Sequence, residues 1–127
     1  MPNVTVDPSA LFLTLETPSG PRRFHASWLR DNAQDAETRA PGNGQRLITI
    51  HDIPVDTVIA AASLADDSTL HVRLEPECKT FTYDVEWLDA HAYDHEIPQS
   101  RGWLPSELTM WDAELMRNVP CGDYAAL

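Results

Sequence analysis

Two histidines in the second half of the chain could contribute to a metal site. His91 and His95 are separated by three residues, so on a helix they would share one face. Such a pair can bind zinc when two further side chains complete the four ligands of the metal. No Cys-x-x-Cys and no glutamate at metal spacing accompanies the pair. We therefore favour two solvent-facing histidines near the end of a short helix, with a zinc site as the alternative.

The sequence lacks the motifs of the common catalytic sites. An iron-dependent oxygenase of the facial-triad kind needs His-x-Asp or His-x-Glu and a distant histidine. The residues two positions after the five histidines are not acidic: Ser27, Ile53, Arg73, Tyr93 and Ile97. There is no Gly-x-Ser-x-Gly and no glycine-rich phosphate loop. The two cysteines, Cys78 and Cys121, lie in unlike contexts, and we expect both to be reduced.

An internal repeat organises the chain. Residues 11–33 align without a gap with residues 70–92 at a constant offset of 59. Each copy alternates apolar and polar residues, turns, and then reaches Trp-Leu, which predicts a hairpin followed by a short helix. Two such units can bury their apolar faces against each other. The identical positions are Leu11, Leu15, Glu16, Trp28, Leu29 and Ala33, matched by Leu70, Leu74, Glu75, Trp87, Leu88 and Ala92.

The segment between the repeats and the caps of the helices carry further signals. Residues 35–44 are polar and rich in Gly, Pro and Asn, which predicts an exposed loop. We predict strands over 45–50 and 55–64, and a helix from about residue 85 with Asp84 as its N-cap. The polar cluster Arg30-Asp-Asn32 follows a buried Trp-Leu. It could contact a ligand, but we favour a salt bridge and a cap that fix the following loop.

These patterns predict an α+β fold. We expect a small, mostly antiparallel sheet built from two repeat-related hairpins with short helices, and an extended C-terminal arm. Trp28 and Trp87 occupy equivalent places in the repeats, so core packing is favoured over a stacking platform. The predicted core is Trp28, Leu29, Trp87, Leu88, Leu13, Leu15, Phe24, Val72, Leu74 and Tyr83.

The charge of the chain restricts its partners. A net charge of −11 over 127 residues disfavours binding to nucleic-acid phosphates or to an anionic membrane surface. No stretch approaches the roughly 20 apolar residues that a membrane-spanning helix needs. The N-terminus shows no basic segment followed by an apolar run, as a signal peptide would. We expect a cytoplasmic protein with no nucleic-acid or membrane partner.

Four motifs together carry a resemblance. They are Phe24-His-Ala-Ser-Trp28-Leu-Arg-Asp-Asn32, Gln45-Arg-Leu47, Asp52-Ile-Pro54 and Trp87-Leu-Asp-Ala-His91-Ala-Tyr-Asp94. This set resembles the N-terminal domain of the γ-butyrobetaine dioxygenase and trimethyllysine dioxygenase family, a module also found alone in small bacterial proteins. The resemblance continues through Trp111-Asp-Ala-Glu-Leu115 and Asp123-Tyr124, which look like the connector to the family's dioxygenase domain.

The resemblance also implies a zinc site, which this chain does not preserve. The family's ligands are three cysteines spaced Cys-x-Cys-x-x-Cys and a histidine after the second Trp-Leu. The matching positions here are Ala33, Asp35, Thr38 and His91. Alanine and threonine cannot replace thiolates, so we predict that no zinc is bound. Without the metal, the loop 33–44 should be mobile, or be held instead by pairing of Arg39 or Asp35.

The family's chemistry lies in a jelly-roll domain that binds iron and 2-oxoglutarate, which this chain does not supply. The resemblance therefore implies a non-catalytic accessory domain, the N-terminal part of a 2-oxoglutarate-dependent dioxygenase. It would contact its own dioxygenase domain or a second subunit, including a second copy of itself. A different hypothesis is a self-standing protein-binding module linked to metal or iron–sulfur trafficking. A small enzyme using His91, His95 and nearby acids is the third.

The segment from Ile97 onward differs from the rest. Prolines interrupt it, and we expect its apolar residues to be buried against another surface. We divide the chain into a domain over residues 1–96 and a connector over 97–127 that leads toward a dioxygenase domain. The candidates for contact with a partner are Trp103, Met110, Trp111 and Met116.

Overall fold

The computed structural model describes residues 3–95, 113–114, 117, 119 and 121–122. Met1–His95 form one compact unit and Glu96–Leu127 a second, and each is considered by itself. The four contact candidates lie outside the described residues: Trp103, Met110, Trp111 and Met116. The fold below is that of the first unit.

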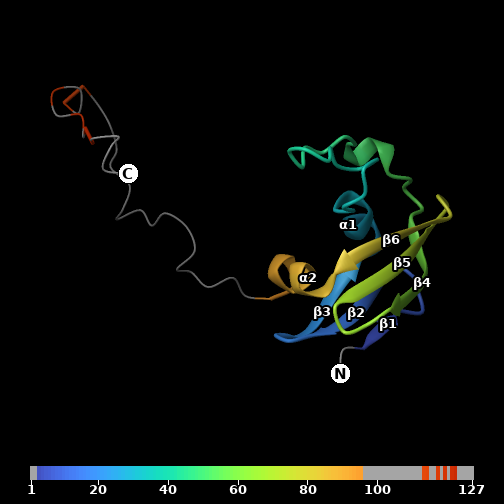
Figure 1. The fold of residues 1–127 in the computed structure, drawn as a ribbon. Coiled ribbons are helices and arrows are strands. Elements are labelled where there is room, and N and C mark those ends of the chain that lie inside the picture. Colours follow the sequence, from blue (N-terminus) through green and yellow to red (C-terminus); the bar gives the residue numbers. More distant parts are fainter. Residues whose placement is uncertain (1–2, 96–112, 115–116, 118, 120, 123–127) are drawn as a thin grey trace. The chain divides into compact units, whose positions relative to one another are not determined.

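Two antiparallel sheets make up this unit (Figure 1). One sheet has the strand order β1-β2-β3 and the other has the order β4-β5-β6. A short helix follows the last strand of each sheet. The elements are β1 (Val4–Val6), β2 (Phe12–Thr17), β3 (Gly20–His25), α1 (Ala26–Asp31), the 3-10 turn η1 (Ile50–Asp52), β4 (Val58–Leu64), β5 (Thr69–Glu75), β6 (Lys79–Asp84) and α2 (Val85–His91).

The sequence repeat is a structural repeat, because β2-β3-α1 and β5-β6-α2 are both hairpins that continue into a helix. The pairing is not identical. In the first hairpin, Leu15 lies opposite Arg22. The repeat would place its counterpart Leu74 opposite Phe81, but Leu74 lies opposite Lys79, two residues earlier in the chain. A shift of two keeps every side chain on its face of the sheet. The second hairpin therefore has a wider turn and the same apolar face.

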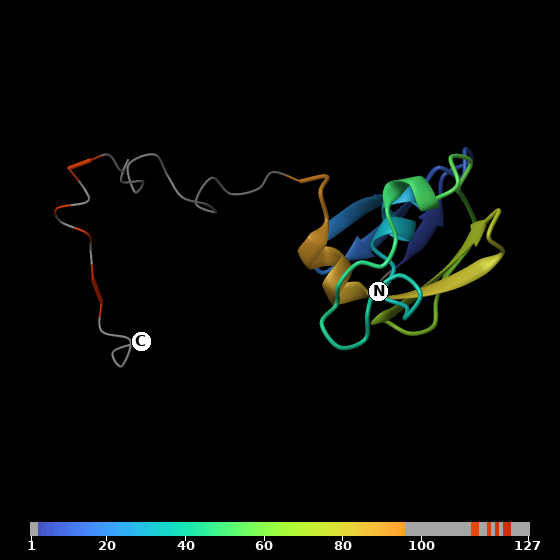
Figure 2. The ribbon, with the colours of Figure 1, turned by 90° about the horizontal axis from the view of Figure 1, so that it is seen from above.

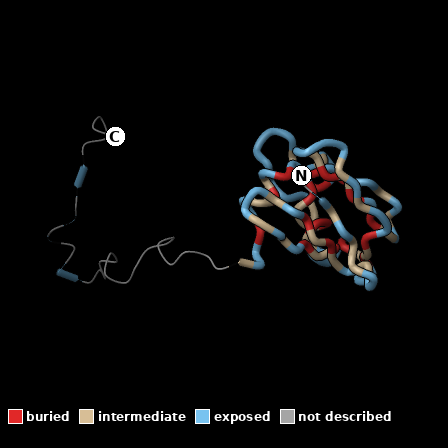
Figure 3. Tube along the Cα trace, turned by 90° about the horizontal axis from the view of Figure 1, so that it is seen from below, coloured by how far each residue is buried: buried red, intermediate tan, exposed pale blue. Residues whose placement is uncertain are grey.

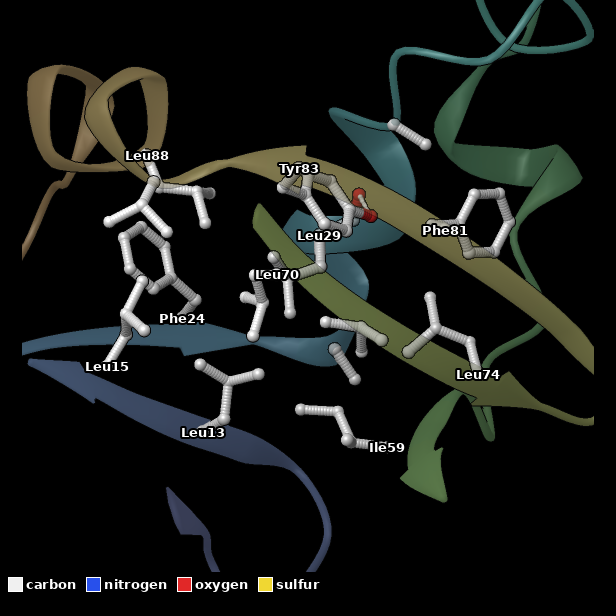
Figure 4. Close-up of a cluster of buried hydrophobic side chains, with 14 of the residues drawn as sticks. Leu13, Leu15, Phe24, Leu29, Ile59, Leu70, Leu74, Phe81, Tyr83 and Leu88 are labelled. Carbon is white, nitrogen blue, oxygen red and sulfur yellow. Dashed lines mark hydrogen bonds between the residues drawn. The ribbon is translucent and has the colours of Figure 1, made fainter. Parts of the chain in front are cut away.

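The apolar faces of the two sheets and one side of each helix meet in a single core (Figure 4). Buried and exposed residues alternate along the strands, and Figure 3 shows this burial on the chain trace seen from below. Eight of the ten predicted core residues are buried, and Trp28 and Trp87 are partly buried and pack against them. The core also contains residues that we did not predict: Ala26, Ala33, Ile59, Leu70, Phe81, Val85 and Ala92.

Each helix contacts the hairpin of the other repeat. The buried Tyr83 hydroxyl on β6 donates a hydrogen bond to the Leu29 carbonyl oxygen of α1, at 2.7 Å. On α2, Asp89 accepts hydrogen bonds from Thr17 and Ser19 at the turn between β2 and β3, both at 2.7 Å. Figures 1 and 2 show α2 beside the turn end of that hairpin. The two repeats are therefore interlocked through their helices.

The segment after α2 covers the free edge of β3. The Ala26 N–H donates to the carbonyl oxygen of Leu11, the residue before β2. Since N–H groups alternate in direction along a strand, those of Arg23 and His25 face away from β2. Asp94 accepts from the Arg23 N–H at 2.7 Å, and the Tyr93 hydroxyl accepts from the His25 N–H at 2.9 Å. These two N–H groups of the β3 edge are therefore not available for pairing with another strand.

The predicted fold class is confirmed, with differences in detail. The sheet is divided in two, and β1 was not predicted. The prediction of a strand over 45–50 is wrong. Within this range only Arg46 forms a β-bridge. The Asp52 carboxylate accepts a hydrogen bond from the Thr49 N–H at 2.8 Å, and this bond turns the chain. The strand expected over 55–64 begins at Val58, since Thr57 bonds to the Pro54 carbonyl. Asp84 is the N-cap of α2, as predicted, and accepts from the Trp87 N–H at 2.7 Å.

Within the residues that the structure describes, no helix is both long and apolar enough to cross a membrane.

The interlocking hydrogen bond of Tyr83 should be measurable. Tyr83→Phe keeps the ring but leaves the buried Leu29 carbonyl without this donor, so the free energy of unfolding should fall by about 1–3 kcal/mol. The measurement is urea unfolding followed by tryptophan fluorescence. Thr80→Val, on the exposed face of the same strand, is the control and should stay within about 0.5 kcal/mol of the parent protein. Equal midpoints for Tyr83→Phe and the parent would contradict this role.

Candidate functional site

The four positions that match zinc ligands lie in different environments. Ala33 and Thr38 are fully buried, Asp35 is partly buried, and His91 is exposed in the last turn of α2. In the part of the chain that the structure describes, no group of three or more His, Cys, Asp or Glu side chains could hold a metal ion. Whether a metal would fit is decided by the groups that contact these positions.

Two cations contact the positions that the resemblance matches to zinc ligands. The Arg30 guanidinium donates to Thr38 Oγ1 at 2.9 Å, and Lys79 Nζ donates to Asp35 Oδ2 at 2.6 Å. Thr38 in turn donates to Asp35 Oδ1 at 2.5 Å. A zinc ion here would meet two positive charges and no thiolate. The residues present therefore do not fit a structural zinc.

These contacts form a cluster of charges that fastens the loop after α1 to the second hairpin. Arg30 Nε binds Glu77 at 2.6 Å, and its guanidinium lies 5.0 Å from the centre of the Phe81 ring. Lys79 also binds Glu37. The expectation of a salt bridge at Arg30 is confirmed, and so is the pairing of Asp35. We call Arg30, Asp35, Thr38, Glu77 and Lys79 the loop clamp.

The pKa values within the loop clamp follow these contacts. Burial alone would raise the pKa of Asp35, but hydrogen bonds from Lys79 and Thr38 outweigh it, and the pKa is lowered. Hydrogen bonds to Asp35 and Glu37 raise the pKa of Lys79. Both shifts favour the charged forms, so the ion pair is stabilised over a wide range of pH.

The one retained ligand position, His91, caps its own helix. Its Nδ1 lies 2.7 Å from the Trp87 carbonyl oxygen, and its ring stacks on Trp87 at 4.2 Å. Asn32 occupies the equivalent place in the first repeat and donates to the Trp28 carbonyl oxygen at 3.0 Å. The cap expected at Arg30-Asp-Asn32 is thus present. Since α2 ends at His91, His95 does not share a helical face with it.

A groove of about 290 Å³ lies between the start of α1 and the turn before β4. Its lining is mainly apolar, and Leu11, Ile50 and Val55 on it are exposed to solvent. Leu11 is 53% exposed, whereas its repeat counterpart Leu70 is fully buried and lies opposite Tyr83 inside the core. The groove is lined by Leu11, His25, Ala26, Ser27, Ile50, Ile53, Pro54, Val55 and Thr57.

The remaining candidates show no arrangement for catalysis in the described residues. The two cysteines are free and exposed. Cys78 Sγ donates to Glu75 at 2.8 Å, and this carboxylate raises the pKa of the thiol, which disfavours the reactive thiolate. His25 pairs through Nδ1 with the Tyr93 hydroxyl at 2.7 Å and is half-buried, as expected for a residue at the edge of the core.

Two sets of residues were missed from the sequence. Glu77 and Lys79 complete the loop clamp, but no local pattern links them to a loop more than 40 residues earlier. The exposed residues of the groove were missed because Ile50 and Val55 fall within the strands predicted over 45–50 and 55–64, whereas in the structure they flank the turn at Pro54 and are exposed. Apolar residues exposed at a turn often mark a contact surface.

The chain was compared with known proteins. No family model matches the sequence. Among curated proteins, γ-butyrobetaine dioxygenase of Pseudomonas sp. (strain AK-1) is 32% identical over 104 residues. The match covers 82% of this chain and 26% of that enzyme, so the chain spans about a quarter of the length of the curated relative it matches. This similarity supports a distant relation to that dioxygenase.

The absence of thiolates gives a prediction about zinc. Protein purified without added metal should contain far less than one zinc per chain, because only one of the four ligands is retained. The triple variant Ala33→Cys, Asp35→Cys, Thr38→Cys should gain zinc, since it restores the ligand set that the resemblance implies. Elemental analysis by plasma mass spectrometry measures both. Stoichiometric zinc in the parent protein would show the prediction to be wrong.

The loop clamp gives a prediction about pH. Because the pKa of Asp35 is lowered in the folded chain, its contribution is present above its unfolded pKa and is lost as the pH falls through the folded value. Asp35→Asn should cost about 1 kcal/mol near pH 6, and the difference should shrink near about pH 3. Urea unfolding at both values measures this, with Asp56→Asn as the exposed control. A constant difference at both pH values would contradict the ionic role.

Proposed function

We propose that this chain is a non-catalytic accessory domain of an iron- and 2-oxoglutarate-dependent dioxygenase similar to γ-butyrobetaine dioxygenase. One observation carries the proposal: the match extends over 82% of this chain but over 26% of that enzyme. A unit of this size would correspond to the N-terminal region of such a protein. The catalytic domain would lie in the part that the match does not cover.

The side chains of this chain support a role without chemistry of its own. None of its five histidines is followed two positions later by Asp or Glu, which is how the facial triad of such oxygenases begins. The loop clamp holds cations where a structural metal would lie. Iron and 2-oxoglutarate would be bound by the catalytic domain, and this unit would need no metal.

The groove supports a role in contact. Exposed Leu11, Ile50 and Val55 surround an apolar hollow, and covering them would remove apolar surface from water. Exposed carboxylates of Asp52 and Asp56 lie next to these residues in the chain. A covering surface with apolar side chains rimmed by Lys or Arg would match both features. We propose that this surface belongs to the catalytic domain.

We propose that residues 1–96 form this domain and that 97–127 connect it to the catalytic domain or reach a second subunit. The apolar residues of the connector would then rest on a partner, and they remain candidates for this contact: Trp103, Met110, Trp111 and Met116.

The proposal is tested by the size and content of the native polypeptide. An antibody against residues 3–95 should detect, in lysate of the source cell, a protein several times larger than 14.2 kDa. Peptide mass spectrometry of that protein should find a His-x-Asp motif beyond residue 127, and the purified protein should consume 2-oxoglutarate. A native species of 14.2 kDa with an unrelated partner would instead favour the self-standing module.

The groove can be tested in the same native protein. The double variant Ile50→Asp, Val55→Asp places charges on the proposed contact, so 2-oxoglutarate turnover should fall by about tenfold or more. Both side chains are exposed, so the fold of this unit should persist. Ala65→Asp, exposed after β4, is the matched control and should keep its activity. Equal turnover in the double variant and the control would remove the groove from the proposal.

A further inference from the structure

A second cavity, of about 240 Å³, lies within the loop that follows α1. Four of its six lining residues are small, namely Ala36, Ala40, Pro41 and Gly44, and a Cβ added at Gly44 would meet nothing within 4 Å. Arg39 is the charged residue among those that line it. The lining residues are Gln34, Ala36, Arg39, Ala40, Pro41 and Gly44.

The Arg39 guanidinium is poorly satisfied within the chain. Its two terminal nitrogens donate to the Gly44 carbonyl and to Asn32 Oδ1, both at 3.4 Å, which is long for a charged donor. Its Nε is buried and has no hydrogen-bond partner among the described residues. Apart from Arg23, every other Arg or Lys that the structure describes pairs with a carboxylate. Arg39 is therefore a cation at the cavity that forms no ion pair with a carboxylate among the described residues.

A second cation lies directly opposite. Arg39 and Arg46 form an isolated antiparallel bridge, flanked by the hydrogen bonds from Leu47 to Thr38 and from Ala40 to Gln45. Side chains opposite each other in such a pair point to the same face, and like charges there repel. Asp31 binds Arg46 at 3.0 Å, which neutralises one of the two charges. One positive charge remains, although the whole chain carries −11.

We propose that this cavity binds an organic carboxylate. The carboxylate oxygens would accept from the terminal nitrogens of Arg39, whose planar fork matches their geometry. Gln34 Nε2 uses one N–H on the Asn32 carbonyl at 2.8 Å, and its other N–H can serve the same anion. A hydrocarbon stem would lie along Ala36 and Pro41, which favours an organic acid over an inorganic anion. This site is independent of the proposed function.

The carboxylate could belong to a free organic acid or to an acidic side chain of another protein, and two probes separate these sources. Sodium propionate represents the free acid, and the blocked peptide acetyl-Ala-Glu-Ala-amide represents the protein side chain. The chain, labelled with 15N, is titrated with each probe at constant ionic strength, with sodium chloride as the reference. The Arg39 Nε–Hε signal and the Gly44 amide signal are followed by NMR.

We expect a saturable shift of both signals with at least one probe and none with chloride. In Arg39→Gln the dissociation constant read from the Gly44 amide should rise by about tenfold or more. Arg23→Gln is the matched control, because Arg23 also lacks a carboxylate partner among the described residues but lies outside the cavity, over the Phe12 ring at 5.4 Å. This control should bind as the parent does.

A second variant keeps the charge and fills the space. Ala36→Leu extends a wall of the cavity, so binding should weaken while the Arg39 signal remains. Saturation by propionate alone assigns the site to free acids, and saturation by the peptide alone assigns it to a protein partner. Shifts that grow linearly with both probes, or that are unchanged in Arg39→Gln, would overturn the proposal. Matching amide spectra of parent and variants establish that the fold is kept.

Discussion

The fold depends on an exchange of contacts between two similar halves. Each hairpin has one apolar face, and the helix that would cover it comes from the other repeat. Tyr83 reaches α1 across the core, and Asp89 on α2 reaches the turn of the first hairpin. An isolated hairpin with one short helix is marginal in water, because it cannot bury enough apolar surface. Neither half is therefore expected to persist without the other.

The residues after the two Trp-Leu pairs take part in the same exchange, although they carry opposite charges. Arg30 and Asp89 are repeat equivalents, and each reaches the turn of the opposite hairpin. Arg30 meets Glu77, whereas Asp89 meets two hydroxyl groups and Arg22, 3.4 Å away. The geometry is shared, but the chemistry has diverged. On the Arg30 side, the result is a cluster of charges that fastens the loop after α1 to the second hairpin.

Much of this fold could be predicted from the sequence, because short-range patterns report the hairpins, the Trp-Leu helices and the Asp84 cap. Apolar alternation reports which face is buried, but it cannot report a register shift of two residues, which leaves every face unchanged. The strand expected over 45–50 failed because the Asp52 side chain bonds the Thr49 backbone and turns the chain there. The pairing of Asp35 with Lys79 depends on tertiary structure alone.

The features that distinguish the halves concentrate in one segment. Residues 32–57 lead from α1 to β4, and only a short stretch follows α2 in the described part of the first unit. This segment carries Asp35 and Thr38 of the loop clamp, the Arg39 cavity and the exposed Ile50 and Val55 of the groove. Ala33 at the start of this segment belongs to the core and Ile53 near its end is buried, so the segment also contributes to stability. Between them, Arg39, Ile50 and Val55 present polar and apolar groups beside the cavity and the groove. The repeats are the frame that holds these surfaces in place.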